Sequence, residues 1–79
     1  MRDFTYQITE RIATISVSRD GSKTLELNMV SYNGREPKID LRRWERGAGR
    51  EKMLKGITLD SDEAIGLGKA LTSLGANLF

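Results

Sequence analysis

The sequence contains neither cysteine nor histidine. The chain can therefore form no disulfide bond, and it lacks the thiol nucleophile, the imidazole base and the Cys/His metal site on which many enzymes depend. Its serines and glycines form no nucleophile elbow and no phosphate-binding loop. We therefore expect neither enzyme activity nor a cofactor. The lack of cysteine also fits a reducing compartment.

Proline, aromatic residues and long apolar runs are scarce as well. One Pro, one Trp, two Tyr and two Phe occur in 79 residues. No apolar run approaches the roughly 18 residues of a membrane span, and no apolar signal segment follows the charged N-terminus. These features predict a single domain over residues 1–79 that is cytoplasmic, associated with the nucleoid, and has no membrane partner. Because so short a chain buries only about 60% of its unfolded surface, we expect a homodimer.

Charge is distributed unevenly along the chain. The formal net charge is +2, yet residues 35–55 carry eight cations and four anions, whereas the remaining residues carry five cations and seven anions. A local excess of cations is typical of a surface that meets a polyanion. A solvated region of mixed charge would give the same pattern.

Four segments have the composition or alternation of strands: residues 4–18, 23–32, 38–44 and 52–59. Asp20-Gly21 and Asn33-Gly34 predict tight two-residue hairpin turns. In the third segment Ile39 and Leu41 alternate with polar residues, which predicts one buried face and one solvated face. Glu45–Glu51 contains two glycines and predicts a mobile loop.

Two positions favour irregular pairing. The apolar parity of the first segment changes near Glu10–Ile12, which predicts a bulge or bend, and Gly56 marks a second candidate bulge in the fourth. Met53, Ile57 and Leu59 share one parity and are expected to face the core. Lys55 has that parity too, so its side chain can contact a ligand only if a bulge at Gly56 turns it to the other face of the strand.

One helix is expected after the last strand. Asp60 and Glu63 have capping-box spacing, and Gly75 predicts the end of the helix, with residues 76–79 beyond it. An apolar stripe lies between, and we expect four of its members to form a dimer contact: Leu67, Gly68, Leu71 and Leu74. A frayed terminal helix is the alternative. The predicted fold is α+β, a four-stranded antiparallel curved sheet followed by one C-terminal helix.

Cations and aromatic residues of the predicted strands point to nucleic acid. Lysine and arginine contacts to phosphates provide affinity that does not depend on sequence, and bases stack on aromatic rings. Trp44 could instead be a core residue, as large aromatic side chains often are, although its parity with Arg42 favours exposure. Tyr32 could instead pack on its hairpin neighbour.

Two strings then resemble a known family. Val30–Trp44 (VSYNGREPKIDLRRW) and Glu51–Leu59 (EKMLKGITL) are similar to the transcriptional positive cofactor four family, in particular its short bacterial members of the YdbC type. The resemblance implies a homodimer joined through its helices, whose curved cationic sheets bind single-stranded DNA largely independently of sequence. It places nucleic-acid contacts at Lys23, Tyr32, Arg35, Lys38, Arg42, Trp44, Lys52 and Lys55. The loop 45–50 and the helix residues Gly66 and Gly68 depart from the family pattern.

Several roles remain open at this point. A single-stranded DNA-binding protein could serve as an accessory factor in transcription, replication or repair, with the transcription machinery as a further partner. The same cationic face could instead bind RNA, because stacking and phosphate contacts do not distinguish RNA from DNA. It could also bind an acidic protein, with Trp44 as the centre of that contact.

Overall fold

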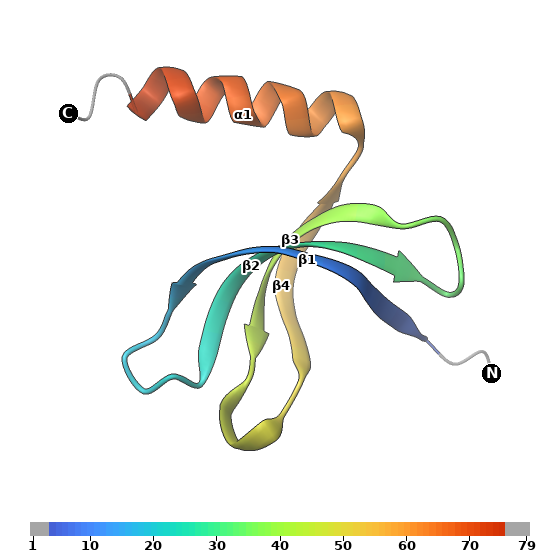
Figure 1. The fold of residues 1–79 in the computed structure, drawn as a ribbon, viewed down its shortest axis with the longest axis vertical. Coiled ribbons are helices and arrows are strands. Elements are labelled where there is room, and N and C mark those ends of the chain that lie inside the picture. The colour runs from blue at the N-terminus through green and yellow to red at the C-terminus, as the bar shows by residue number, and fades with distance from the viewer. Residues whose placement is uncertain (1–3, 76–79) are drawn as a thin grey trace.

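In a computed structural model of the protein, which describes residues 4–75, four strands precede one helix (Figure 1). The elements are β1 (Tyr6–Val17), β2 (Lys23–Tyr32), β3 (Lys38–Glu45), the short 3-10 turn η1 (Gly47–Gly49), β4 (Lys52–Leu59) and α1 (Ser61–Gly75). The strands pair with their chain neighbours, all antiparallel, in the order β1-β2-β3-β4. The predicted four-stranded antiparallel sheet followed by one helix is thus confirmed. The segment 76–79 lies outside the described residues.

The two predicted hairpin turns have different outcomes. Asn33 and Gly34 both have positive φ, 53° and 74°, and the Arg35 N–H donates to the Tyr32 carbonyl at 3.0 Å. These are the properties of the predicted tight turn. At Asp20-Gly21 the prediction of the turn is wrong, because the hydrogen-bonded turn is centred on Arg19-Asp20, where the Gly21 N–H donates to the Ser18 carbonyl at 2.9 Å. Five residues separate the paired strands at both connections, 18–22 and 33–37, so neither connection is a two-residue hairpin. Asp20 instead holds a wider loop together, since its Oδ1 accepts the Ser22 N–H at 3.0 Å.

Bulges occur in both regions where they were expected. The β1–β2 register shifts at three places, between Ile8 and Glu10, Arg11 and Ala13, and Thr14 and Ser16. The β3–β4 register shifts once, because Arg42 lies opposite Gly56 whereas Trp44 lies opposite Met53. The extra residue of β4 interrupts the alternation. The prediction that Met53 shares a face with Ile57 and Leu59 is therefore wrong, since Met53 lies on the Trp44 side of the sheet.

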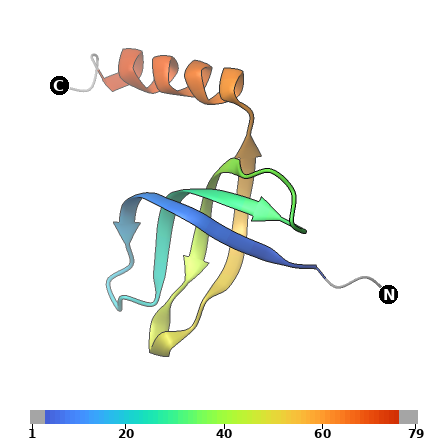
Figure 2. The ribbon, with the colours of Figure 1, turned by 45° about the vertical axis from the view of Figure 1, so that its right-hand side comes forward.

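The sheet is strongly curled (Figure 2). Tyr6 in the first strand donates its hydroxyl to Glu51 Oε2 at 2.9 Å, so side chains from opposite edges of the sheet meet across one face. We call this face, which carries the even-numbered residues of β2 and β3, the inner face. The other, with the odd-numbered residues of the same strands, is the outer face.

Burial is the reverse of the sequence prediction. The buried residues lie on the inner face and are mostly polar: Thr24, Glu26, Asn28, Val30, Asp40 and Trp44. Ile39 and Leu41, predicted to be buried, are only half-buried on the outer face. The curl encloses the inner face, whereas little of the described chain, residues 4–75, covers the apolar outer face.

Helix α1 leaves the end of β4 and runs past one end of the sheet (Figures 1 and 2). The predicted capping box is present, because the Glu63 N–H donates to Asp60 Oδ1 at 2.8 Å and the Asp60 N–H donates to Glu63 Oε1 at 2.9 Å. None of the described helix residues is buried. Between helix and outer face lies an apolar groove of about 250 Å³, which we call the outer groove; it is lined by Ile12, Leu27, Ile39, Leu59, Ala64, Leu67, Gly68 and Leu71.

Candidate functional site

A row of aromatic rings runs from the β2–β3 turn into the inner face. The ring centroids are 5.9 Å apart for Tyr32 and Phe4, 6.3 Å for Phe4 and Tyr6, and 5.6 Å for Tyr6 and Trp44. The pairing of Tyr6 with Tyr32 across β1 and β2 brings these rings together. Phe4 is 63% exposed and Trp44 is fully buried. The row therefore has one solvent-exposed end, at Phe4, and one buried end, at Trp44.

The exposure predicted for Trp44 is wrong. Its ring packs against Tyr6, and the Arg46 guanidinium carbon lies 4.7 Å from its centre, within the range of a cation–π contact. The indole Nε1 has no hydrogen-bond partner within residues 4–75. Alternation along β3 identified the face of Trp44 correctly, but the curl of the sheet encloses that face.

Tyr32 is held in place by a buried carboxylate. Its hydroxyl donates to Asp40 Oδ2 at 2.5 Å, and Arg42 donates to both oxygens of Asp40 at 2.9 Å. Burial, followed by the bond to Asp40, raises the pKa of Tyr32 to about 12. Arg42 also donates to the Leu54 carbonyl at 3.0 Å. These bonds occupy the Arg42 guanidinium within the fold, and only 14% of its side chain is exposed.

A second buried carboxylate organises the rest of the inner face. The Arg46 guanidinium donates two hydrogen bonds to the carboxylate of Glu26, from Nε–H to Oε2 at 2.9 Å and from Nη2–H to Oε1 at 2.7 Å. Thr24 and Asn28 donate to Glu26 as well. Hydrogen bonding to Arg46 outweighs burial and lowers the pKa of Glu26 to about 2. The arginine and the carboxylate thus satisfy one another inside the curl.

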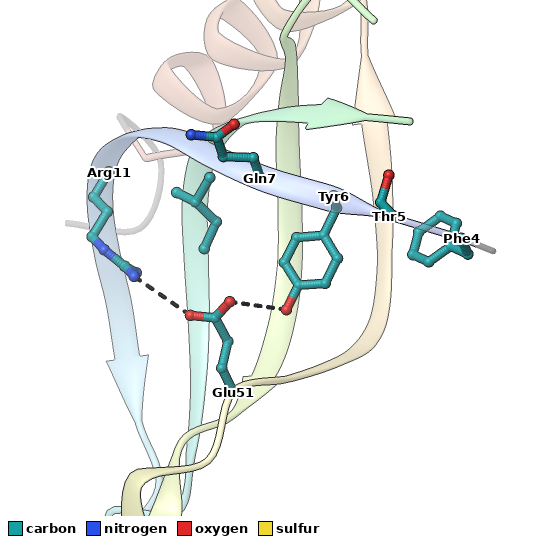
Figure 3. A pocket seen from close by; sticks show the side chains of 7 residues that line it. Phe4, Thr5, Tyr6, Gln7, Arg11 and Glu51 are labelled. Atoms are coloured by element: carbon teal, nitrogen blue, oxygen red, sulfur yellow. Dashed lines mark hydrogen bonds and ion pairs between the residues drawn. The ribbon is translucent and has the colours of Figure 1, made fainter. Parts of the chain in front are cut away.

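Beside the aromatic row lies an open hollow of about 540 Å³ (Figure 3). Its lining comes from β1, the residues before it and the residue before β4: Phe4, Thr5, Tyr6, Gln7, Ile8, Arg11 and Glu51. Tyr6 and Arg11 point toward Glu51, and a hydrogen bond from Tyr6 is the largest of the effects that lower the pKa of that carboxyl. Arg11 remains largely exposed, with its ion-pair distances at 3.6 and 3.7 Å.

Five predicted phosphate contacts are exposed and make no ion pair with any residue in 4–75: Lys23, Arg35, Lys38, Lys52 and Lys55. The fold brings only some of them together. Arg35 lies in the turn after Tyr32, and Lys38 begins β3 on the inner side, opposite Val30. We call Phe4, Tyr32, Arg35 and Lys38 the hairpin rim.

Lys23 and Lys52 lie elsewhere, each paired with Glu45 at the other end of the outer face. The seven residue steps from Lys38 to Glu45 along β3 correspond to about 23 Å. Lys55 lies in the bulged segment of β4. The predicted contacts therefore do not form one continuous track on a single face.

Sequence reasoning missed Phe4 and Tyr6 as members of the aromatic row. The shared parity of Phe4, just before β1, and Tyr6, the first residue of β1, was a signal. The residue of β2 that pairs with Tyr6 could not be predicted from the sequence, however, because three register shifts separate this end of β1 from the β1–β2 loop. The start of β1 is fixed to the turn by Thr5, whose N–H donates to Asn33 Oδ1 at 3.0 Å and whose carbonyl accepts the Asn33 N–H at 2.9 Å.

Two kinds of feature are absent from residues 4–75. No group of three or more acidic, histidine or cysteine side chains is placed to hold a metal ion. No helix in that range is long and apolar enough to cross a membrane.

Of the predicted dimer contacts, Leu67 and Gly68 line the outer groove, as does Leu71, which is 56% exposed; Leu74 is 54% exposed.

Comparison with known proteins agrees with the resemblance noted in the sequence. The chain is 40% identical over 72 residues to an uncharacterized protein of Treponema pallidum (strain Nichols), covering 91% of this chain and 81% of that protein. The sequence pattern of the family described as Transcriptional Coactivator p15 (PC4) matches residues 20–70, which include Tyr32, Arg35 and Lys38 of the hairpin rim. With this match over most of its length and the four-strand, one-helix fold, the chain belongs to the PC4 family.

Proposed function

We propose that this protein binds single-stranded DNA with little dependence on sequence, as an accessory factor in transcription, replication or repair. The observation that carries the proposal is the hairpin rim, where exposed aromatic surface lies beside Arg35 and Lys38, two cations without ion pairs in the described chain. Membership of the PC4 family implies the same class of ligand. Rings and cations together are the usual surface for single strands, because bases stack while lysine and arginine contact phosphates.

Tyr32 has the rigidity that stacking requires. Asp40 and Arg42 fix its hydroxyl, so the ring loses little further freedom when a base packs against it. Arg35 and Lys38 supply phosphate contacts at the rim. Lys23, Lys52 and Lys55 are proposed as additional contacts for a strand that continues past the rim toward the other end of the sheet.

We propose in addition that the protein works as a homodimer. The outer face presents half-buried leucine and isoleucine side chains, and α1 leaves Leu71 and Leu74 more than half exposed. An apolar surface of this kind, formed by a sheet and a helix, is suited to pack against the same surface of a second copy of the chain.

Titration of fluorescently labelled oligothymidine tests the binding proposal. Affinity should fall as salt rises from about 50 to 200 mM, because each neutralised phosphate contributes about −0.7 to the slope of log K against log salt for single strands. Exchange of both Arg35 and Lys38 for glutamine should reduce that slope by about 1.4. The Lys23→Gln/Lys52→Gln pair applies the same measurement to the other end of the sheet.

A matched control is Lys69→Gln, an exposed cation of α1 that is not among the proposed contacts. It should leave the slope unchanged. Absence of binding by the wild type at low salt, or an affinity insensitive to salt, would refute the proposed function. A parallel titration with oligouridine of equal length measures any preference between DNA and RNA, since 2′-hydroxyl contacts are what separate them.

A further inference from the structure

We infer that Phe4 is a base-stacking residue, the outermost ring of the nucleic-acid surface; this inference rests on the proposed function. Phe4 lies outside residues 20–70, the part of the chain that the PC4 family pattern matches. Phe4 lies just before β1 and belongs to the part of the chain that the family pattern does not cover. Its proposed ligand is one nucleobase of a bound single strand.

The ring of Phe4 is exposed to solvent. Of the rings in the described residues, Phe4 is the most accessible, at 63%, while Tyr6 and Tyr32 are half-buried and Trp44 is enclosed. An isolated exposed phenylalanine is common on protein surfaces. Phe4 is not isolated, because its ring contacts Tyr6 and Tyr32 at 6.3 and 5.9 Å between centroids.

The Phe4 ring is supported from behind by its two neighbouring rings. Both neighbouring rings are themselves fixed, Tyr6 by Glu51 and Tyr32 by Asp40. Thr5, the next residue along the chain, is tied to the turn through two hydrogen bonds with Asn33. The ring is therefore backed by a rigid platform, which lowers the entropy lost when a base stacks on it.

The surroundings fit a nucleotide. Phe4 forms one end of the open hollow drawn in Figure 3, which offers room beside the ring. Arg35 lies two residues from Asn33 in the turn to which Thr5 is bonded, and it has no ion-pair partner within residues 4–75. A ring for the base and a guanidinium for a neighbouring phosphate are thus offered at the same end of the sheet.

Three substitutions separate stacking from simple apolar contact. Phe4→Ala should weaken oligothymidine binding about 5- to 150-fold, the equivalent of one stacked base. Phe4→Leu, which keeps apolar bulk and loses the π-face, should weaken it nearly as much. Phe4→Trp should preserve affinity, and its exposed indole should be quenched on binding. Ile15→Ala, at an exposed apolar residue of β1 outside the hollow, is the control and should bind as the wild type does.

An oligonucleotide of equal length and charge with abasic sites provides the second measurement. Wild type and Phe4→Ala should bind it equally, whereas Arg35→Gln should still weaken binding. If Phe4→Leu keeps full affinity, or if the abasic strand leaves the Phe4→Ala effect intact, base stacking at Phe4 is refuted. Wild-type binding that all three Phe4 variants retain without quenching refutes only the inference, while failure of the wild type to bind refutes the proposed function itself.

Discussion

At the scale of single residues, the unusual feature is that the buried face of the sheet is the polar one. Asp40 and Glu26 are enclosed, and each is neutralised by an arginine that donates two hydrogen bonds to it. Removing one member of such a pair leaves a buried charge without a partner, which costs several kcal/mol. The two arginines therefore act as structural residues, and the cations proposed for phosphate binding are the exposed ones.

The first prediction concerns Glu26 and pH. Its pKa is about 2 in the folded protein against an ordinary value of 4.5. Because the folded pKa is depressed, the ionised pair stabilises the fold fully above about pH 5, and this contribution is lost as pH falls from about 4.5 through 2. The shift corresponds to on the order of 3 kcal/mol.

Urea unfolding at pH 7, 5 and 3 measures this effect. Glu26→Gln should be less stable than the wild type by a few kcal/mol at pH 7, and the difference should shrink as the pH approaches 3 and below. Glu36→Gln, at an exposed carboxylate of the β2–β3 connection, should match the wild type throughout. A Glu26→Gln deficit that is equal at pH 7 and pH 3 would contradict the assigned ionisation.

The residue scale is also where prediction from sequence was weakest. Alternation correctly separated Asp40 and Trp44 from Ile39 and Leu41. It assigned burial to the wrong side, because hydrophobicity alone does not reveal that a sheet is curled or that carboxylates are paired inside it. Tyr32, Arg35 and Lys38 were proposed from local sequence, whereas the place of Phe4 beside Tyr32 depends on the register of β1 against β2.

At the scale of elements, the pairing of β3 with β4 depends on one glycine. Gly56 lies opposite Arg42, next to the single register shift between these strands. A Cβ added there would lie 2.6 Å from the Leu41 carbonyl oxygen and would collide with the Arg42 side chain and backbone. Glycine is therefore required because the neighbouring backbone approaches closely.

The second prediction follows from this close approach. Gly56→Ala should destabilise the protein by at least about 1–3 kcal/mol, since the strand must shift to admit a methyl group. Gly66→Ala is a matched control in α1, where a Cβ meets nothing within 4 Å. It should stabilise the protein by up to about 1 kcal/mol, the difference in helix propensity. Thermal unfolding should thus shift in opposite directions; a tolerated Gly56→Ala would show that β4 can move away from β3.

Elements were more predictable than residues because their signals are local. The Asn33-Gly34 turn and the Asp60–Glu63 capping box each depend on a few adjacent residues, and both occur as expected. The loop around Asp20 is longer than expected because its side chain bonds to Ser18 and Ser22, which stabilises a wider connection. The positions of the bulges could be predicted approximately. Which face of the sheet a side chain such as Met53 lies on after a bulge depends on the register with the partner strand.

At the scale of the whole molecule, one chain leaves much of its apolar surface in water. The outer groove separates α1 from the sheet, and eight large apolar residues of the described chain are at least 46% exposed. Among them are Ile57 of β4, Ile65 and two leucines of α1. A domain of this size gains little stability from a core so incomplete, which is the physical basis for the proposed homodimer.

The third prediction tests that dimer in solution. Sedimentation equilibrium near 100 μM protein should give twice the 8.9 kDa of one chain, and the unfolding temperature should rise with protein concentration because association stabilises the folded state. Leu71→Asp places a charge at the mouth of the outer groove and should shift the mass toward 8.9 kDa. Lys69→Asp, at a neighbouring helix position that does not line the groove, should remain dimeric.

Circular dichroism verifies that each variant is folded, and the concentration dependence of wild-type unfolding does not rely on any variant. A wild-type mass of 8.9 kDa, with an unfolding temperature independent of concentration, would show that the outer face is not covered by a second copy.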